Sequence, residues 1–104
     1  MQAEALKGHL DTLILAVLGA GPLHGYAIIE RLKERSGGTL ALPEGTVYPA
    51  LHRLEEAGYL ASSWSSETGR RRRVYSLTRR GRRELGTRRD GWREFSATME
   101  AVLA

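Results

Sequence analysis

The chain has 104 residues, which is enough for one domain with a modest hydrophobic core. It contains no cysteine, so disulfide bridges and thiolate metal sites are excluded. No apolar run is long enough to span a membrane and no secretory signal opens the chain, so we expect a soluble cytoplasmic protein with no membrane partner.

The charge is distributed unevenly along the chain. Residues 1–69 hold five Lys/Arg and eight Asp/Glu, whereas residues 70–104 hold eleven Arg and four Asp/Glu. The two parts therefore carry −3 and +7, which add to the net charge of +4. Arginine presents a planar fork that suits phosphates and guanine edges. The basic segment is typical of nucleic-acid binding, and a solvated Arg-rich surface is the alternative.

Two helices are predicted first. Residues 9–19 predict a scaffold helix because apolar side chains recur at helical spacing, namely Leu10, Leu13, Ile14, Val17 and Leu18. Residues 24–35 predict a second helix, and residues 37–43 predict the turn that follows it. Tyr26 falls in the first turn of the second helix, where its hydroxyl could touch a phosphate or its ring could pack in the core.

Residues 44–58 contain the predicted helix around which the fold is organised, and this helix is expected to start near Thr46. Val47, Leu51 and Leu54 fall at i, i+4 and i+7, so one stripe of this helix is expected to be buried. Gly58 stands where a left-handed C-terminal cap is expected.

The start and the polar side of this helix carry the candidate DNA contacts. We expect Thr46 to be the N-cap, so that Pro49 would fall in the first turn and cost no backbone hydrogen bond. Tyr48, His52 and Arg53 lie on the polar side, from which they could reach bases or phosphates. These features favour the recognition helix of a helix-turn-helix module. An ordinary amphipathic helix with a solvated polar face is the open alternative.

Residues 59–66 and 72–77 predict the two strands of a β-hairpin with a turn at 67–69. Alternation groups these apolar side chains by face: Leu60 with Trp64 in the first strand, and Tyr75 with Leu77 in the second. The tip of the hairpin carries four consecutive arginines, Arg70, Arg71, Arg72 and Arg73. A basic hairpin directly after a recognition helix is the wing of a winged helix-turn-helix, where Arg meets the backbone or the minor groove. A hairpin that only packs is the alternative.

The last helix is predicted from the N-cap Thr78 to about Leu103. Its apolar residues follow a heptad seam and are Leu85, Trp92, Phe95, Met99, Val102 and Leu103. Three glycines at 81, 86 and 91 weaken its first half by roughly 1 kcal/mol each. A helix weakened in this way is stable only if its apolar seam is covered by another surface, and a second copy of the chain could cover it.

No catalytic or metal-binding constellation is found. His9, His24 and His52 lie on three different predicted elements, and no His pair has metal-ligand spacing. The segment 19–21 lacks the preceding strand and the third glycine of a dinucleotide fingerprint. Glu55 and Glu56 are adjacent on a helix, so their carboxylates diverge. We therefore expect no enzyme activity, no cofactor and no metal.

The order of elements and several motifs resemble the PadR family of bacterial transcriptional regulators. The matching stretches are Leu23-His-Gly-Tyr-Ala-Ile28, Glu44-Gly-Thr-Val-Tyr-Pro-Ala-Leu-His-Arg-Leu-Glu55, Gly58-Tyr-Leu60, Gly69-Arg70, Tyr75, Leu77-Thr78 and Gly81. Proteins of this family often have Pro after the Gly-Arg pair and an aromatic residue before the wing Tyr. Here Arg71 and Val74 occupy those positions, which predicts a less rigid and more basic wing.

The resemblance implies a homodimeric repressor that pairs through its last helix. Some members bind planar hydrophobic compounds between paired Trp residues at the dimer interface, and Trp92 is the residue that could do so here. A Trp92 that only fills the dimer seam is the alternative.

We predict a mainly α protein with a small β-hairpin (α+β). Residues 1–78 would form the winged helix-turn-helix domain, and residues 79–104 the C-terminal dimerisation helix. The dimer contacts would be Leu85, Trp92, Phe95, Met99 and Val102.

The predicted function is a sequence-specific repressor that binds an inverted-repeat operator in double-stranded DNA and is released by a small hydrophobic ligand. Its DNA contacts would be Tyr26, Thr46, Tyr48, Pro49, His52, Arg53 and Arg70 to Arg73. Two alternatives stay open, a winged-helix protein-interaction module and a small-molecule sensor without direct DNA readout.

Overall fold

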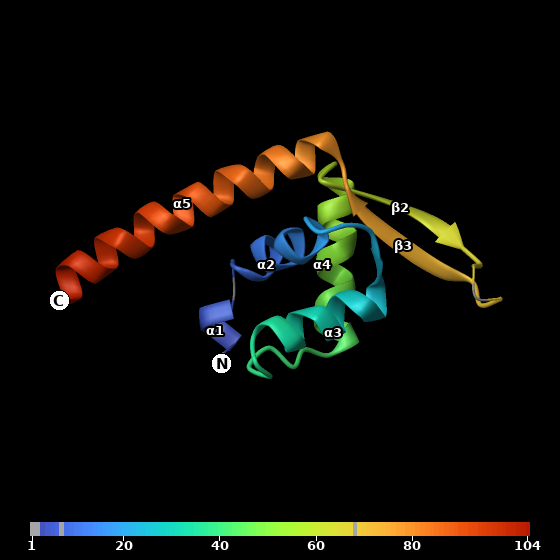
Figure 1. Ribbon diagram of the computed structural model, residues 1–104, viewed down its shortest axis with the longest axis horizontal. Coiled ribbons are helices and arrows are strands. Elements are labelled where there is room, and N and C mark those ends of the chain that lie inside the picture. Colours follow the sequence, from blue (N-terminus) through green and yellow to red (C-terminus); the bar gives the residue numbers. More distant parts are fainter. Residues whose placement is uncertain (1–2, 7, 68) are drawn as a thin grey trace.

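A computed structural model describes residues 3–6, 8–67 and 69–104 of the protein. The elements in chain order are α1 (Ala3–Leu6), α2 (Leu10–Leu18), β1 (Leu23–His24), α3 (Gly25–Arg35), α4 (Glu44–Glu56), β2 (Leu60–Ser65), β3 (Arg72–Leu77) and α5 (Arg79–Leu103). Helices α2, α3 and α4 pack together, the β2–β3 hairpin projects on one side, and α5 extends away on the other (Figure 1). The arrangement confirms the predicted mainly helical winged helix-turn-helix with a long C-terminal helix.

The core lies where α2, α3 and α4 meet the base of the sheet. The largest fully buried side chains are Ile14, Leu15, Leu18, Ile28, Val47, Leu51 and Leu54. They come from the stripes that helical spacing indicates, together with Leu15, which lies outside the predicted stripe of α2. Burying such a side chain stabilises the fold by roughly 1.5–3 kcal/mol.

Among the described residues, no helix is both long enough and apolar enough to cross a membrane.

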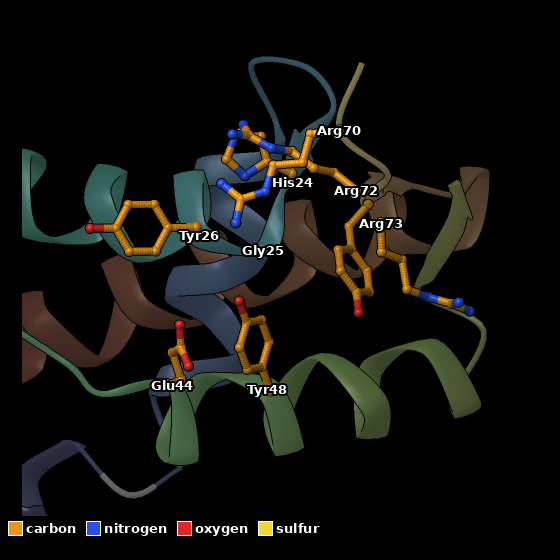
Figure 2. A pocket seen from close by; sticks show the side chains of 9 residues that line it. His24, Gly25, Tyr26, Glu44, Tyr48, Arg70, Arg72 and Arg73 are labelled. Atoms are coloured by element: carbon orange, nitrogen blue, oxygen red, sulfur yellow. The ribbon is translucent and has the colours of Figure 1, made fainter. Parts of the chain in front are cut away.

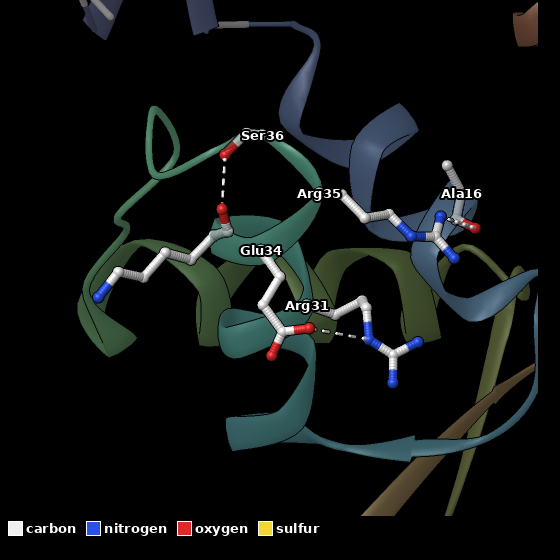
Figure 3. Close-up of polar contacts among 6 residues, drawn as sticks. Ala16, Arg31, Glu34, Arg35 and Ser36 are labelled. Atoms are coloured by element: carbon white, nitrogen blue, oxygen red, sulfur yellow. Dashed lines mark hydrogen bonds and ion pairs between the residues drawn. The ribbon is translucent and has the colours of Figure 1, made fainter.

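Helix α3 ends in a glycine-rich turn that leads towards α4. Ser36 donates its hydroxyl to the carbonyl of Lys33 at 3.1 Å (Figure 3). Its hydroxyl oxygen also accepts the amide of Leu40 at 2.8 Å. Gly37 and Gly38 follow with φ of +61° and +92°, which only glycine adopts without strain. Arg35 ties the end of α3 to the carbonyl of Ala16 in α2 at 3.4 Å.

The N-cap of helix α4 lies three residues earlier than predicted. Pro43 is its N-cap and makes no side-chain hydrogen bond, so the expectation that Thr46 is the N-cap is wrong. The carbonyl of Pro43 accepts the amides of both Thr46 and Val47, at 3.0 and 3.2 Å. An extended Pro43 followed by Glu44 favours this start, because a carboxylate in the first turn suits the helix dipole.

The earlier start moves Pro49 into the second turn of α4. A residue there would normally donate its amide to the carbonyl of Gly45, and proline has no amide hydrogen. The expectation that Pro49 costs no helical hydrogen bond is therefore wrong. At the other end, Gly58 has φ of +83°, and the amide of Tyr59 bonds the carbonyl of Leu54 at 3.0 Å. This is the predicted left-handed cap.

The sheet has three strands in the order β1-β3-β2, and all pairs are antiparallel. The two-residue strand β1 was not predicted. It places Leu23 opposite Tyr75 and His24 opposite Val74, so the start of α3 is tied directly to the wing.

The hairpin runs past the core. Leu60, Tyr75 and Leu77 are buried at its base, as the alternation predicts. Trp64 is on the same side of β2 as Leu60 and pairs with Arg73, but it is 54% exposed because the core ends before it. The outer half of the wing is therefore held by its own strand pairing and local side-chain contacts and not by the core.

Helix α5 joins the core only through its first turns. Thr78 is the N-cap as predicted, accepting the amide of Gly81 at 3.0 Å. Gly81 lies so close to the carbonyl of Tyr59 that a side chain would not fit. Leu85, expected in a seam between two chains, is 7% exposed and packs into the core of its own chain. The unpartnered part of the seam begins at Trp92.

Candidate nucleic-acid interface

One side of α4 faces solvent. Val47, Ala50, Leu51 and Leu54 are buried, whereas Thr46, Pro49, His52 and Arg53 are exposed. The helix therefore presents a continuous exposed ridge, called the polar ridge of α4 below, from its first turn to its last. This ridge contains four of the five predicted contact residues of α4.

Tyr48, the fifth, is placed differently. Its ring lies against Gly25 at the start of α3, and there is no room for a side chain on Gly25. Burial, with a smaller effect of the Glu44 carboxylate, raises the pKa of the Tyr48 hydroxyl. The hydroxyl is therefore protonated at neutral pH and can donate a hydrogen bond.

A cleft of about 540 Å³ separates the N-terminal turns of α4 from the wing. Its lining residues come from three segments and are His24, Gly25, Tyr26, Glu44, Tyr48, Arg70, Arg72, Arg73 and Tyr75 (Figure 2). Five of the residues proposed from the sequence are thus brought together, Tyr26, Tyr48, Arg70, Arg72 and Arg73. Tyr26 is 56% exposed at the edge of the cleft, so the alternative of a core-packing ring is wrong.

His24 joins α3 to the wing inside this cleft. It is the N-cap of α3, where its Nδ1 accepts the amide of Ala27 at 3.2 Å. Its Nε2 lies 2.8 Å from Nη1 of Arg72, 48 residues along the chain. Burial and, secondly, the Arg72 charge lower the pKa of His24, so the ring is neutral at pH 7.

The four wing arginines do not act as one group. Arg70, Arg72 and Arg73 line the cleft, whereas Arg71 lies over the Trp64 ring with 4.5 Å from its guanidinium carbon to the ring centre. Arg73 donates to the Ser62 hydroxyl at 2.9 Å and also approaches the Trp64 ring. The sequence predicts a uniform basic tip, but the fold divides it between two surfaces.

Arg73 is further held by α4. Its Nη2 lies 3.8 Å from Oε2 of Glu55, and this carboxylate also accepts the Ser62 hydroxyl at 2.6 Å. Through these contacts the base of the wing is attached to the C-terminal half of α4. Burial raises the pKa of the neighbouring Tyr75, and the Arg73 charge opposes that effect.

Arg53 is paired within the chain. Its Nη2 lies 3.1 Å from Oδ1 of Asp11 in α2, yet its side chain is 59% exposed. The pair keeps the guanidinium at the side of the polar ridge of α4, where it remains accessible.

The second candidate surface is the outer part of α5. It exposes four apolar side chains of the predicted seam, Trp92 at 52%, Phe95 at 55%, Met99 at 43% and Val102 at 78%. The His9 ring meets Trp92 edge-on with 5.5 Å between ring centres, and the centre of the Phe95 ring lies 6.0 Å from that of Trp92. One chain therefore covers part of the Trp92 ring and leaves the rest open.

Sequence reasoning missed His24, Gly25 and Trp64. His24 and Gly25 belong to a stretch that carries the family resemblance, but their partners Arg72 and Tyr48 are distant in sequence. For Trp64, the nearby arginines were a usable signal, because Arg stacks readily on Trp. In the described part of the chain, no three His, Asp or Glu side chains gather as a metal-binding group.

Comparison with known proteins places these features in a family. The model of the Transcriptional regulator PadR-like family matches residues 14–87. A solved transcriptional regulator from Clostridium thermocellum has a TM-score of 0.89 and 27% identity, over 100% of this chain and 99% of that one. A Mycobacterium tuberculosis transcriptional regulator is 46% identical over 63 residues, which are 61% of this chain and 56% of that protein.

A complex with DNA is among the similar solved structures. Bacillus subtilis PadR, solved with operator DNA, has a TM-score of 0.68 and 30% identity, over 77% of this chain and 46% of that one. The family match covers the helices, the wing and the first turns of α5, which are the parts that form the cleft and the polar ridge. The chain therefore belongs to the PadR-like family of DNA-binding transcriptional regulators, and is a regulator of transcription rather than an enzyme.

Proposed function

We propose that this protein is a homodimeric repressor that binds an inverted-repeat operator and is released by a planar hydrophobic ligand. The observation that supports it best is the cleft, because it brings the N-terminal turns of α4 and three wing arginines to one side of the molecule. A protein-interaction module would be favoured by a wing folded away from α4. The shared cleft supports DNA binding over that alternative.

The DNA contacts fall into two classes in this proposal. Thr46, Pro49 and His52 on the polar ridge of α4 would enter the major groove, with Tyr48 at its edge. The phosphate backbone would be met by Tyr26, Arg53 and the wing arginines, Arg70 to Arg73. Base contacts give selectivity, whereas phosphate contacts give affinity for any sequence.

The dimer would form through α5, with residues 79–104 as the dimerisation helix and residues 1–78 as the DNA-binding domain. Trp92, Phe95, Met99 and Val102 are exposed along one side of α5, and no other element of the described chain covers that side. A second copy, related by a two-fold axis, would cover the seam and place one α4 in each of two major grooves.

The ligand proposal concerns Trp92. Two copies facing each other across the dimer axis could hold a flat apolar molecule between their rings. His9 and Phe95 already cover the sides of each ring, so a planar guest on the free part of the ring suits the geometry. Bound between two chains, such a guest would change their relative placement and so the spacing of the two α4 helices.

Selection of bound duplexes from a random pool tests the DNA proposal. The expected result is an inverted repeat whose half-site centres are about 10 base pairs apart, or a multiple of that distance. Binding should weaken steeply as salt rises, because phosphate contacts release counterions. Recovery of no enriched sequence, together with no salt-dependent affinity for any duplex, would refute the proposal.

A further inference from the structure

Two hydrogen-bond donors approach the ring of His24, which has only one acceptor nitrogen when it is neutral. A neutral imidazole carries one N–H and one lone-pair nitrogen. Nδ1 lies 3.2 Å from the amide nitrogen of Ala27 and Nε2 lies 2.8 Å from Nη1 of Arg72, and both of these groups can only donate. Whichever nitrogen carries the proton, one of the two contacts therefore sets a donor against a donor.

An added acceptor at Nε2 resolves this conflict. If Nδ1 keeps the α3 cap, Nε2–H and Nη1 of Arg72 are two donors 2.8 Å apart on the lining of the cleft. An oxygen anion placed there would accept from both. With the proton on Nδ1 instead, Nε2 would accept from Arg72, and the cap of α3 would be the contact that lacks an acceptor.

Resting on the proposed DNA-binding function, we propose that this cleft seats one backbone phosphate of the duplex between Nε2–H of His24 and the guanidinium of Arg72. Binding would hold the ring proton on Nε2, so that Nδ1 stays free to accept the Ala27 amide at the cap of α3. His24 thus contributes a neutral donor, and Arg72 contributes the charge.

The surroundings fit a phosphate of DNA. Three arginines and one carboxylate, that of Glu44, line the cleft, so its charge balance is positive. The Tyr48 hydroxyl is on the same lining and is protonated, which adds a donor. The cleft opens between the two elements that the duplex would contact, so a backbone strand crossing from the α4 groove to the wing would pass over it.

Two substitutions of His24 separate its two roles. His24→Asn keeps an N-cap oxygen near the position of Nδ1 and has no group at the position of Nε2. His24→Gln keeps an amide donor near Nε2 and is a poor N-cap. The test measures the affinity of each variant for operator and random duplexes over a salt series, together with thermal unfolding.

We expect His24→Asn to unfold like the wild type and to bind both duplexes about tenfold more weakly or worse, as when a hydrogen bond to a charged group is removed. Its log–log salt slope should be unchanged, because the net charge stays the same. His24→Gln should unfold at lower temperature and bind closer to the wild type. Arg72→Gln should weaken binding and flatten the slope by about 0.9 for each phosphate that the protein no longer neutralises.

Nitrogen-15 NMR of the His24 ring gives an independent readout. Addition of duplex should produce a protonated, hydrogen-bonded Nε2 and an unprotonated Nδ1, and inorganic phosphate is titrated separately. If the wild type and His24→Asn bind duplex equally well, this inference is overturned and the DNA-binding proposal still stands. A ring response to inorganic phosphate in a protein that binds no duplex would refute both, since the site would then serve a free anion.

Discussion

The guanidinium of Arg71 stacks on the ring of Trp64, and Arg73, which pairs with Trp64 across the hairpin, approaches the same ring. The distances from guanidinium carbon to ring centre are 4.5 and 5.3 Å. The wing extends beyond the core, so this aromatic platform adds to the strand pairing that holds its outer half. The stacking restrains the wing at the position where proteins that resemble this chain often have Pro and this chain has Arg71.

Trp64→Ala should therefore weaken binding to any duplex about two- to tenfold. The substitution removes the two exposed cation–π contacts of Arg71 and Arg73, each worth roughly 0.5–1 kcal/mol. The two side chains are then mobile in the free protein, and ordering them on DNA reduces the binding free energy. The salt slope should stay as in the wild type because no charge is removed. Trp64→Tyr keeps an aromatic face and is the control. Full affinity of the Ala variant at all salt concentrations would show that the wing is ordered by its backbone alone.

The glycines of α5 allow a matched test of packing. A side chain at Gly81 would collide with the carbonyl of Tyr59, whereas Gly86 has nothing within 4 Å of the corresponding position. Gly81→Ala should lower the free energy of unfolding by roughly 1–3 kcal/mol through overpacking. Gly86→Ala should raise it by up to about 1 kcal/mol, since Ala is the better helix former. Denaturant unfolding at one protein concentration measures both, and equal effects would contradict this packing.

Sequence patterns predicted the parts of the fold whose signals are local. The spacing of Val47, Leu51 and Leu54 indicated α4, Gly58 indicated its end, and Thr78 indicated the start of α5. Each of these depends on neighbours within one or two turns of helix. The exposure of Trp64 was not predictable in the same way, because alternation assigns a face but does not say where the core stops.

Features that depend on distant partners could not be predicted. Strand β1 has two residues, too few for a periodic pattern, and exists because β3 offers an edge to pair with. The contact between His24 and Arg72 spans 48 residues, and no spacing rule relates the two. Leu85 fits a heptad seam, yet the seam turns into the core at that point because α5 packs on α2 there.

The dimer proposal predicts that Phe95→Asp separates the chains. Phe95 is 55% exposed on α5, so the substitution should leave the fold of one chain intact while placing a charge in the seam. Ala97→Asp puts the same charge on the opposite side of α5 and should leave the dimer unchanged. Analytical ultracentrifugation at micromolar concentration distinguishes them, and a wild type that sediments as a monomer throughout this range would contradict the dimer.

The ligand proposal predicts saturable quenching of Trp92 fluorescence by planar apolar dyes. Trp64 also fluoresces, so the measurement is made in a Trp64→Phe background. Trp92→Ala should abolish binding, because the two rings form the faces of the site. Val102→Ala, nearer the C-terminal end of the same seam, is the control: it changes dimer packing but keeps both Trp92 rings. Dye binding at full affinity in the Trp92→Ala variant would place the site elsewhere.

Base readout by α4 is tested with His52 and Arg53, which are adjacent and exposed but differ in their surroundings. Arg53 is tethered to Asp11 at 3.1 Å at the side of the polar ridge, whereas His52 lies on the ridge without such a partner among the described residues. His52 is thus the better placed to reach a base edge, and Arg53 to reach a phosphate. Removing a base contact typically costs about 1–3 kcal/mol and relaxes selectivity at that base pair, whereas removing a phosphate contact weakens all sequences together.

His52→Ala should accordingly narrow the affinity ratio between operator and scrambled duplex, and Arg53→Ala should lower both affinities in parallel and flatten the salt slope. Asp11→Asn is the control for the ion pair, since it frees Arg53 without removing its charge and should not weaken binding. Both duplexes are measured at several fixed salt concentrations. If the operator-to-scrambled ratio of His52→Ala equals that of the wild type, His52 does not read a base, and readout must come from the remaining ridge residues Thr46 and Pro49 or from Tyr48 at its edge.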